Sequence, residues 1–338
     1  RAAEGHVGGQ FGDELGVARK AGIALEVTDI FRHRILVDQA QITTRAINGV
    51  MEAISPFSLL ATKRAVGDIS NDLAILCGID ASQIEDAYPC TPLQEGLLSL
   101  TAKREGSYVR QTVLELSTAI EVDVLKAAWE SALGSTTILR TRIVQHESMG
   151  LVQVVSKEGI TWNSSQDLES FLVKDRALPM GLGDALTRFA LIDSTDGKPQ
   201  SLVWTVHHAL YDGWSHNLVM DLVSRAYRGH KLAARAEFNA FVKHVSSIND
   251  TKAESFWQSY LANGEFAPFP ALPSSIQEPT ANETFELVLP PSAKTEVTMS
   301  TLIRAALAVV ISQYTGSTDV SACSALKFFF MYSVWSIV

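Results

Sequence analysis

Short runs of alternating hydrophobic and polar residues occupy the middle of the chain, and this alternation is typical of strands with one buried face. Around them, apolar residues recur every three or four positions, which predicts amphipathic helices. The expected strands cover residues 109–116, 138–145, 150–157, 186–193, 200–208 and 285–290; the expected helices cover 68–77, 120–133, 236–248, 252–262 and 301–314, with others starting near Pro92 and around Leu218. Because strands and helices do not alternate strictly, we predict an α+β fold with a mixed sheet and covering helices.

Changes in composition divide the chain into five expected segments. These are a short helical segment at 1–50, a linker at 51–83, a main α+β unit at 84–295, the start of a further unit at 296–320 and an atypical hydrophobic tail at 321–338. The uncharged run of the tail begins at Phe328 and is shorter than the roughly 20 residues that span a bilayer. We interpret the tail as a gene-model error, with a buried strand as the alternative.

Composition narrows the class of protein. The 338 residues are 46% hydrophobic and 19% charged with a net charge of −9, which excludes a disordered chain. No cluster of Lys and Arg marks a nucleic-acid partner, and no run marks a membrane partner. The three cysteines, Cys77, Cys90 and Cys323, have neither a disulfide framework nor a zinc-site spacing, so we expect a reduced, cytoplasmic setting.

One segment, HHALYDGWS at 207–215, concentrates the chemistry. It lies where a predicted strand ends and a predicted helix begins, so a side chain there is exposed on a rigid support. Histidine at such a place can act as a general base, and Gly213 would allow a tight turn beside it. His207 and His208 are adjacent on a strand, so their side chains point to opposite faces and we expect no shared metal ion.

HHALYDGWS, together with YPCTPLQEGLL at 88–98 and ILRTRIV at 138–144, resembles the condensation domains of nonribosomal peptide synthetases, and YPCTPLQEGLL is most similar to fungal members. FNAFVKHV at 238–245 fits a weaker motif of the family, and the resemblance covers about residues 84–320. It implies two chloramphenicol-acetyltransferase-like lobes that form a V. It also implies substrates tethered as thioesters to 4'-phosphopantetheine arms of donor and acceptor carrier domains, with adenylation domains as further partners and no directly bound cofactor or metal.

The resemblance assigns roles residue by residue. His208 would be the catalytic histidine of amide-bond formation, and Gly213 would be the glycine beside the reacting thioester. Asp212 would be a structural carboxylate paired with Arg140, or otherwise with Arg142. Backbone N–H groups at 213–215 are the candidate donors to the oxyanion. The remaining supporting residues would be His207, Trp214 and Ser215.

The two ends depart from the family pattern. Residues 1–50 resemble the end of a carrier domain, but Gly8 and Gly9 are followed by Gln10 and Phe11, and no serine precedes Ser55. We therefore expect this remnant to be unable to accept phosphopantetheine. Residues 301–320 resemble the start of the second lobe, and the later motifs of that lobe are absent from the sequence. The predicted fold thus has a truncated second lobe.

Other functions share parts of this pattern. A coenzyme A-dependent acyltransferase has the same His-x-x-x-Asp-Gly arrangement, but the carrier-like segment and YPCTPLQEGLL argue against it. An epimerisation domain shares the doubled histidine and fits the upstream motif less well. An inactive truncated product is the third alternative. The amino acids joined, the donor stereochemistry, the product and the neighbouring modules cannot be deduced from this sequence.

Overall fold

The computed structural model describes residues 23–24, 44–45, 54–269 and 299–320, apart from short gaps at 104–105, 195–196, 198, 233–235, 249, 263, 265–266 and 268. The chain divides into two compact units, of which one comprises Met51–Ile248 with the final residues and the other Arg1–Val50 with Asn249–Phe328. The first of these, here called the main unit, contains the predicted site. The predicted strand at 285–290, the tail at 321–338 and nearly all of the N-terminal segment lie outside the described residues.

The larger sheet of the main unit has four strands in the order β4-β9-β8-β7. β4 pairs antiparallel with β9 and β8 pairs antiparallel with β9, whereas β7 pairs parallel with β8, so the predicted mixed sheet is confirmed. The strands are β4 (Val109–Glu115), β7 (Trp162–Ser165), β8 (Thr187–Asp193) and β9 (Pro199–His207).

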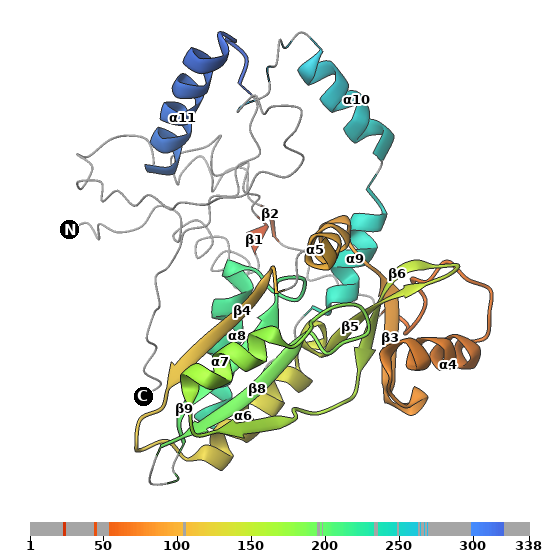
Figure 1. Ribbon diagram of the computed structural model, residues 1–338. Helices are drawn as coiled ribbons and strands as arrows, with labels where there is room; N and C mark the ends of the chain where they lie inside the picture. Colours follow the sequence, from red (N-terminus) through yellow and green to blue (C-terminus); the bar gives the residue numbers. More distant parts are fainter. Residues whose placement is uncertain are drawn as a thin grey trace. The chain divides into compact units, whose positions relative to one another are not determined.

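The two faces of this sheet are covered by different helices (Figure 1). Trp129 of α6 (Val122–Gly134) packs on Phe189 of β8 and Trp204 of β9, with ring centroids 5.0 and 5.2 Å apart, and Leu222 of α8 (Gly213–Tyr227) joins the same core. α7 (Leu168–Ala177) covers the opposite face, where Phe171 packs near Val203. The sheet that leads to the predicted site is therefore buried on both sides.

The smaller sheet is antiparallel, in the order β3-β6-β5, with β3 (Ile84–Pro89), β5 (Thr141–His146) and β6 (Gly150–Ser156). One face packs against α4 (Val66–Cys77), whose Ile69 and Leu73 are buried beside Val152. The other face packs against α9 (Phe238–Ser246) through Val242 and Val155. α5 (Pro92–Lys103) follows β3 directly.

The segment predicted as a linker, 51–83, takes part in the core. Leu60 and α4 contribute to the cluster under the smaller sheet, because every third or fourth residue of α4 is apolar and buried. The helix itself was expected at 68–77 and is confirmed. Among the strands and α-helices of the main unit, β3, β7 and α7 were not predicted, since IEDAYP and WNSS lack a regular alternation and α7 has a weakly amphipathic, charged sequence.

The second unit holds the short strand pair β1 (Ile23–Ala24) and β2 (Thr44–Arg45), α10 (Asp250–Leu261) and α11 (Met299–Thr315). Both helices were predicted, whereas β1 and β2 lie in the segment at 1–50 that was expected to be helical. α11 leaves many apolar side chains exposed, among them Val309 at 58% and Tyr314 at 78%. No helix among the described residues is both long enough and apolar enough to cross a membrane.

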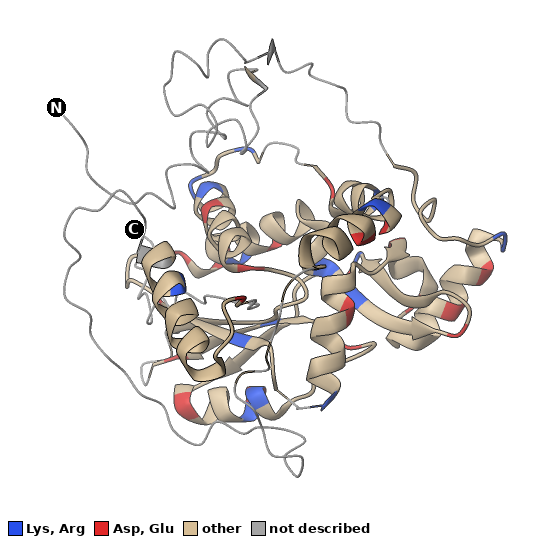
Figure 2. Cartoon of the chain, turned by 90° about the horizontal axis from the view of Figure 1, so that it is seen from above, with Lys and Arg blue, Asp and Glu red and all other residues tan. Residues whose placement is uncertain are grey.

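Charges of both signs are interspersed along the described elements (Figure 2). α6, α7 and α10 each carry residues of both signs, whereas α4 carries only acidic ones. This agrees with the dispersed charge of the sequence.

Candidate active site

The predicted catalytic histidine follows directly after the last residue of β9. The N–H of His208 donates to the carbonyl of Tyr108 at 2.8 Å, and Tyr108 has a φ of +63°, an unusual conformation for a residue with a side chain. The His208 ring stacks on Tyr211, with centroids 4.8 Å apart. The side chain is half-buried. His208 is thus held through its backbone by Tyr108, the residue before β4, and by one face of its ring, while part of the imidazole stays accessible.

His207 occupies the opposite face and is fully buried. Its Nε2 lies 2.8 Å from Thr101 Oγ1 on α5, and its Nδ1 accepts the N–H of Ala209 at 3.0 Å. Burial, with a smaller contribution from His208, lowers the pKa of His207 to about 4. A neutral ring with the proton on Nε2 satisfies both contacts, so the geometry agrees with the structural role expected for His207.

Asp212 begins α8 and forms a capping box with Ser215. Its carboxylate accepts the N–H groups of Trp214 at 3.1 Å and Ser215 at 2.7 Å, and its own N–H donates to Ser215 Oγ at 2.8 Å. Partial burial opposes ionisation, but the donors on Ser215 and Trp214, together with His208, outweigh it and lower the pKa of Asp212. The supporting role expected for Ser215 therefore has a physical basis, and the exposed Trp214 points away from the core.

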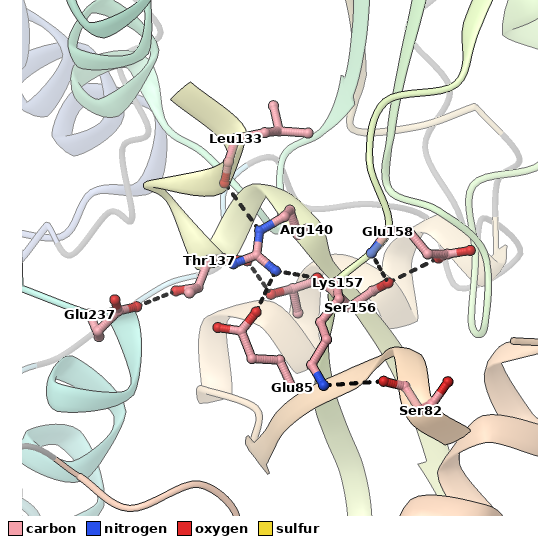
Figure 3. Close-up of polar contacts among 10 residues, drawn as sticks. Ser82, Glu85, Leu133, Thr137, Arg140, Ser156, Lys157, Glu158 and Glu237 are labelled. Atoms are coloured by element: carbon pink, nitrogen blue, oxygen red, sulfur yellow. Dashed lines mark hydrogen bonds and ion pairs between the residues drawn. The ribbon is translucent and has the colours of Figure 1, made fainter. Parts of the chain in front are cut away.

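The predicted pairing of Asp212 with Arg140 is wrong. Arg140 donates from Nε to Leu133 O at 3.1 Å and from one terminal nitrogen to Glu85 at 2.8 Å and to Ser156 O (Figure 3). Glu85 lies in β3, Ser156 is the last residue of β6, and Leu133 lies in the last turn of α6. Arg140 sits at the end of a 3₁₀ turn, Thr137–Arg140, that aims the guanidinium at these acceptors.

The alternative partner, Arg142, does not reach Asp212 either. It pairs with Glu158 at 2.9 Å and donates to the carbonyls of Cys77 and Gly183. Asp212 instead satisfies its carboxylate within the first turn of α8, so no arginine is needed to balance it.

Gly213 does not make the tight turn that was expected of a glycine. Its φ is outside the left-handed region, and a Cβ built there would have no atom within 4 Å. The open space beside it leaves room for a substrate to approach the backbone. Of the three N–H groups expected to bind the oxyanion, those of Trp214 and Ser215 are already donated to Asp212. Among the described residues the Gly213 N–H has no hydrogen-bond partner, so it is the remaining donor.

The aromatic surroundings of His208 were not expected from the sequence. Tyr211 is buried between His208 and Trp204, and His216 stacks on Trp204 with centroids 5.3 Å apart. Burial raises the pKa of Tyr211 against the influence of the nearby Arg110, and burial together with Arg110 lowers the pKa of His216. Tyr211 and His216 lie in or just after the motif, but only their packing on β9 shows that they line the site.

A cavity of about 260 Å³ lies away from His208, beside β5 and β8. Three arginines line it, and each is already bound to carboxylate or carbonyl oxygens. We therefore do not assign the cavity to substrate. Among the described residues no group of three or more His, Cys, Asp or Glu side chains could hold a metal ion.

Comparison with known proteins identifies large fungal relatives. "Nonribosomal peptide synthetase dtxS1" of Metarhizium robertsii is 42% identical over 91% of this chain and 4% of its own length. "Peramine synthetase ppzA" of Metarhizium rileyi is 42% identical over 90% of this chain and 11% of its own length. "AM-toxin synthetase AMT1" of Alternaria alternata is 40% identical, with 90% and 7% covered. The chain thus spans a small part of these relatives.

Solved structures share the fold. Crystal structures described as "The crystal structure of CT" and "The crystal structure of holo T3CT" superpose with TM-scores of 0.62 and 0.63 at 24% and 23% identity. Each match covers 78% of this chain and 61% of the other. The predicted fold class, an α+β, chloramphenicol-acetyltransferase-like lobe, is confirmed.

The family model for the condensation domain matches residues 84–326. This range includes β3, α5, the strand pairs of both sheets and the whole HHALYDGWS turn. The resemblance of the three sequence motifs is confirmed by this match, whereas the carrier-like origin of residues 1–50 stays a prediction. The chain belongs to the condensation domain family.

Proposed function

We propose that this chain catalyses amide-bond formation between two carrier-tethered substrates, as part of a nonribosomal peptide synthetase. The observation that carries the proposal is the placement of His208 at the end of β9, half-exposed, with the unpartnered Gly213 N–H and open space at the start of α8. A base and an oxyanion donor on neighbouring rigid elements are the groups that acyl transfer to an amine requires.

The proposed reaction uses these groups in order. His208 accepts or orients the proton of the attacking amine while the nitrogen adds to the thioester carbonyl. The Gly213 N–H donates to the carbonyl oxygen as negative charge develops there. Collapse of the tetrahedral intermediate forms the amide and releases the thiol of the donor arm. His207 stays neutral and keeps the turn in place, and Asp212 fixes the start of α8.

Partners and location follow from the same proposal. The substrates would arrive on 4'-phosphopantetheine arms of a donor and an acceptor carrier domain and would be activated by adenylation domains of the same synthetase. The named relatives are synthetases, and their matched share is larger than residues 84–338, so the similarity extends into the segment before Ile84. Cys77 and Cys90 are free and buried, which is consistent with the cytoplasmic setting that we propose.

The test is product formation from loaded carriers. The purified chain is incubated with a donor and an acceptor carrier that bear aminoacyl arms, and the dipeptidyl carrier is detected by mass spectrometry. We expect His208→Ala to lower the rate by about 100- to 10,000-fold. His230→Ala, in the exposed turn after α8, is the matched control and should be silent.

Each alternative gives a distinct result. No product from the wild-type chain, beside an active reference condensation domain, would favour the inactive alternative. Transfer from coenzyme A thioesters but not from carriers would favour the acyltransferase alternative.

A further inference from the structure

The turn that carries His208 is held by α5, the helix that begins within YPCTPLQEGLL. Three of its residues, Gln94, Leu98 and Thr101, make up its buried face. Two of these are polar, and both reach the turn: Thr101 through the ring of His207, and Gln94 through the carbonyl of Ala209. The proposed catalytic chemistry uses the first contact only to hold His207 and gives the contact of Gln94 no role.

Gln94 has a fixed amide orientation. Its Oε1 accepts the N–H of Thr91 at 2.9 Å, and its Nε2 donates to Gln153 Oε1 at 2.8 Å and to Ala209 O at 3.2 Å. A backbone N–H can only donate and a backbone carbonyl can only accept, so the amide cannot be turned round. Gln153 is fixed in the same way, because its own Nε2 donates to Pro89 O.

The oxygen and the nitrogen of the Gln94 side-chain amide therefore have different roles. The acceptor end completes the capping box at the start of α5, which a glutamate at this position would also do. The donor end binds Gln153 of β6 and the carbonyl of Ala209. A glutamate has no side-chain N–H and could not make these two bonds. Gln94 and Gln153 are 4% and 0% exposed, so water does not replace these bonds.

The peptide units around Ala209 are held from both sides. The Ala209 N–H is bound by His207 Nδ1 at 3.0 Å, and the Ala209 C=O is bound by Gln94. His208 precedes these groups directly, and its own N–H is bound by Tyr108 O. Loss of the Gln94 bond would leave the carbonyl free to rotate and would loosen the backbone that sets the direction of the His208 ring.

We propose that Gln94 is a positioning residue for His208, acting through the carbonyl of Ala209. This inference rests on the proposed function for its catalytic consequence, but the clamp itself is a property of the fold. A misplacement of a reacting group by about 1 Å can cost about 100-fold in rate.

The experiment uses two variants of the whole chain. Gln94→Glu keeps the cap acceptor and loses the donor; Gln94→Met has a similar length and loses both. The control, Asp167→Ala, removes the side-chain cap of α7, where Asp167 accepts the Ser170 N–H, and so perturbs a helix start far from the turn. With loaded carriers we expect both Gln94 variants to lower kcat about 10- to 100-fold with KM changed less than about threefold. Asp167→Ala should leave both unchanged.

Two further measurements need no turnover. Hydrogen exchange at the Ala209 amide should be protected in the wild-type chain and about 5- to 10-fold faster in Gln94→Met. The ¹⁵N signal of the unprotonated Nδ1 of His207 should shift in both Gln94 variants, because its donor moves, and should stay in place in Asp167→Ala. Circular dichroism confirms that each variant is folded.

The outcomes are separable. An inactive wild-type chain defeats the proposed function, and the exchange and ¹⁵N data still test the clamp. Wild-type kcat and an unmoved His207 signal in folded Gln94→Met would overturn the inference alone. If neither Gln94 variant folds, the side-chain amide of Gln94 in the wild-type chain decides, because its protons make the bonds to Ala209 and Gln153. Slow exchange of these protons supports the clamp, and exchange at the rate of an exposed side-chain amide refutes it.

Discussion

Asp212 and Ser215 bind each other reciprocally at the start of α8: the Ser215 N–H donates to the Asp212 carboxylate at 2.7 Å, and Ser215 Oγ accepts the Asp212 N–H at 2.8 Å. The acidic residue of the motif therefore acts as a helix cap. Its bonds to Trp214 and Ser215 also leave the N–H of Gly213 as the one open donor at this helix start, among the residues that the structure describes.

The cap predicts how substitutions at Asp212 rank. Asp212→Ala removes the acceptor for two N–H groups and should lower the free energy of unfolding by about 1 kcal/mol. Asp212→Asn and Asp212→Ser retain a capping oxygen and should lose much less. Urea unfolding monitored by circular dichroism measures this difference. Equal losses in all three variants would contradict the capping role.

A double-mutant cycle tests the independence of Asp212 and Arg140. Arg140→Ala should be destabilising, since it leaves Glu85 and two carbonyls without their donor. Because the two residues share no partner, the losses from Arg140→Ala and Asp212→Ala should add to within about 0.5 kcal/mol in the double variant. A coupling energy well above this value would revive the ion pair.

His207 predicts a pH dependence of stability. Its pKa is about 4 in the folded protein and near 6.5 when unfolded, so the unfolded chain binds the proton more readily. The contribution of neutral His207 is complete above pH 6.5 and is lost as the pH falls from 6.5 through 4, with an upper limit of about 3 kcal/mol. Unfolding free energies measured across this range should fall.

The control for this prediction is His207→Gln, which keeps a donor and an acceptor but does not titrate. Its stability should vary less with pH between 6.5 and 4 than that of the wild-type chain. Parallel curves for the two proteins would mean that other groups, and not His207, cause the loss.

A buried ion pair on the other face of the sheet should matter for stability. Asp175 of α7 binds Arg188 Nε at 2.8 Å and also accepts from Thr205 and Gln111. Burial opposes its ionisation, but these three donors outweigh it and lower the pKa of Asp175, so the carboxylate contributes fully at neutral pH. Asp175→Ala should cost about 3 kcal/mol in urea unfolding at pH 7, because it leaves Arg188 without its partner.

The exposed pair between Arg64 and Asp72 serves as the comparison. Both side chains are far more accessible, at 45% and 39%, and solvent screens their attraction. Asp72→Ala should therefore have little effect. A loss as large as that of Asp175→Ala would show that burial does not set the strength of these pairs.

The exposed apolar residues of α11 predict a tendency to associate. Leu307, Val309 and Val310 are each at least 44% exposed, and such a surface favours contact between molecules. Deletion of residues 296–338 should raise the soluble yield and lower the apparent mass in light scattering. A full-length chain that is monomeric at high concentration would contradict this expectation.

An element can be predicted from the sequence alone when its residues follow a local pattern, such as alternation or a helix cap. The strand at 109–116 alternates between apolar and polar residues, the strand at 200–208 is a short run rich in β-branched and aromatic residues, and the start of α5 has a capping sequence, so each was predictable. β7 is four residues long with three exposed or half-exposed polar side chains, and only its pairing with β8 makes it a strand. Pattern cannot show a pairing of this kind.

The residues of the candidate site could be predicted from the sequence, but their hydrogen-bond and ion-pair partners could not. The motif placed His208, Asp212 and Ser215 together because they are neighbours along the chain. The partners of Arg140 and Gln94 lie far away in sequence, at Glu85 or Ser156 and at Gln153 or Ala209. Choosing among such partners requires the register of the two sheets, which local sequence does not encode.

The pairing of β4 with β9 also has a consequence for the order of folding. β8 and β9 form a hairpin across a short loop, whereas Val109 pairs with His207 about a hundred positions away. Contacts between distant residues close large loops and form late, so β4 is expected to dock after the hairpin. The bond from His208 to Tyr108 stands at the end of that last pairing. A slow step in refolding should thus coincide with completion of the histidine turn, and a partly folded chain would have every local element and no assembled site.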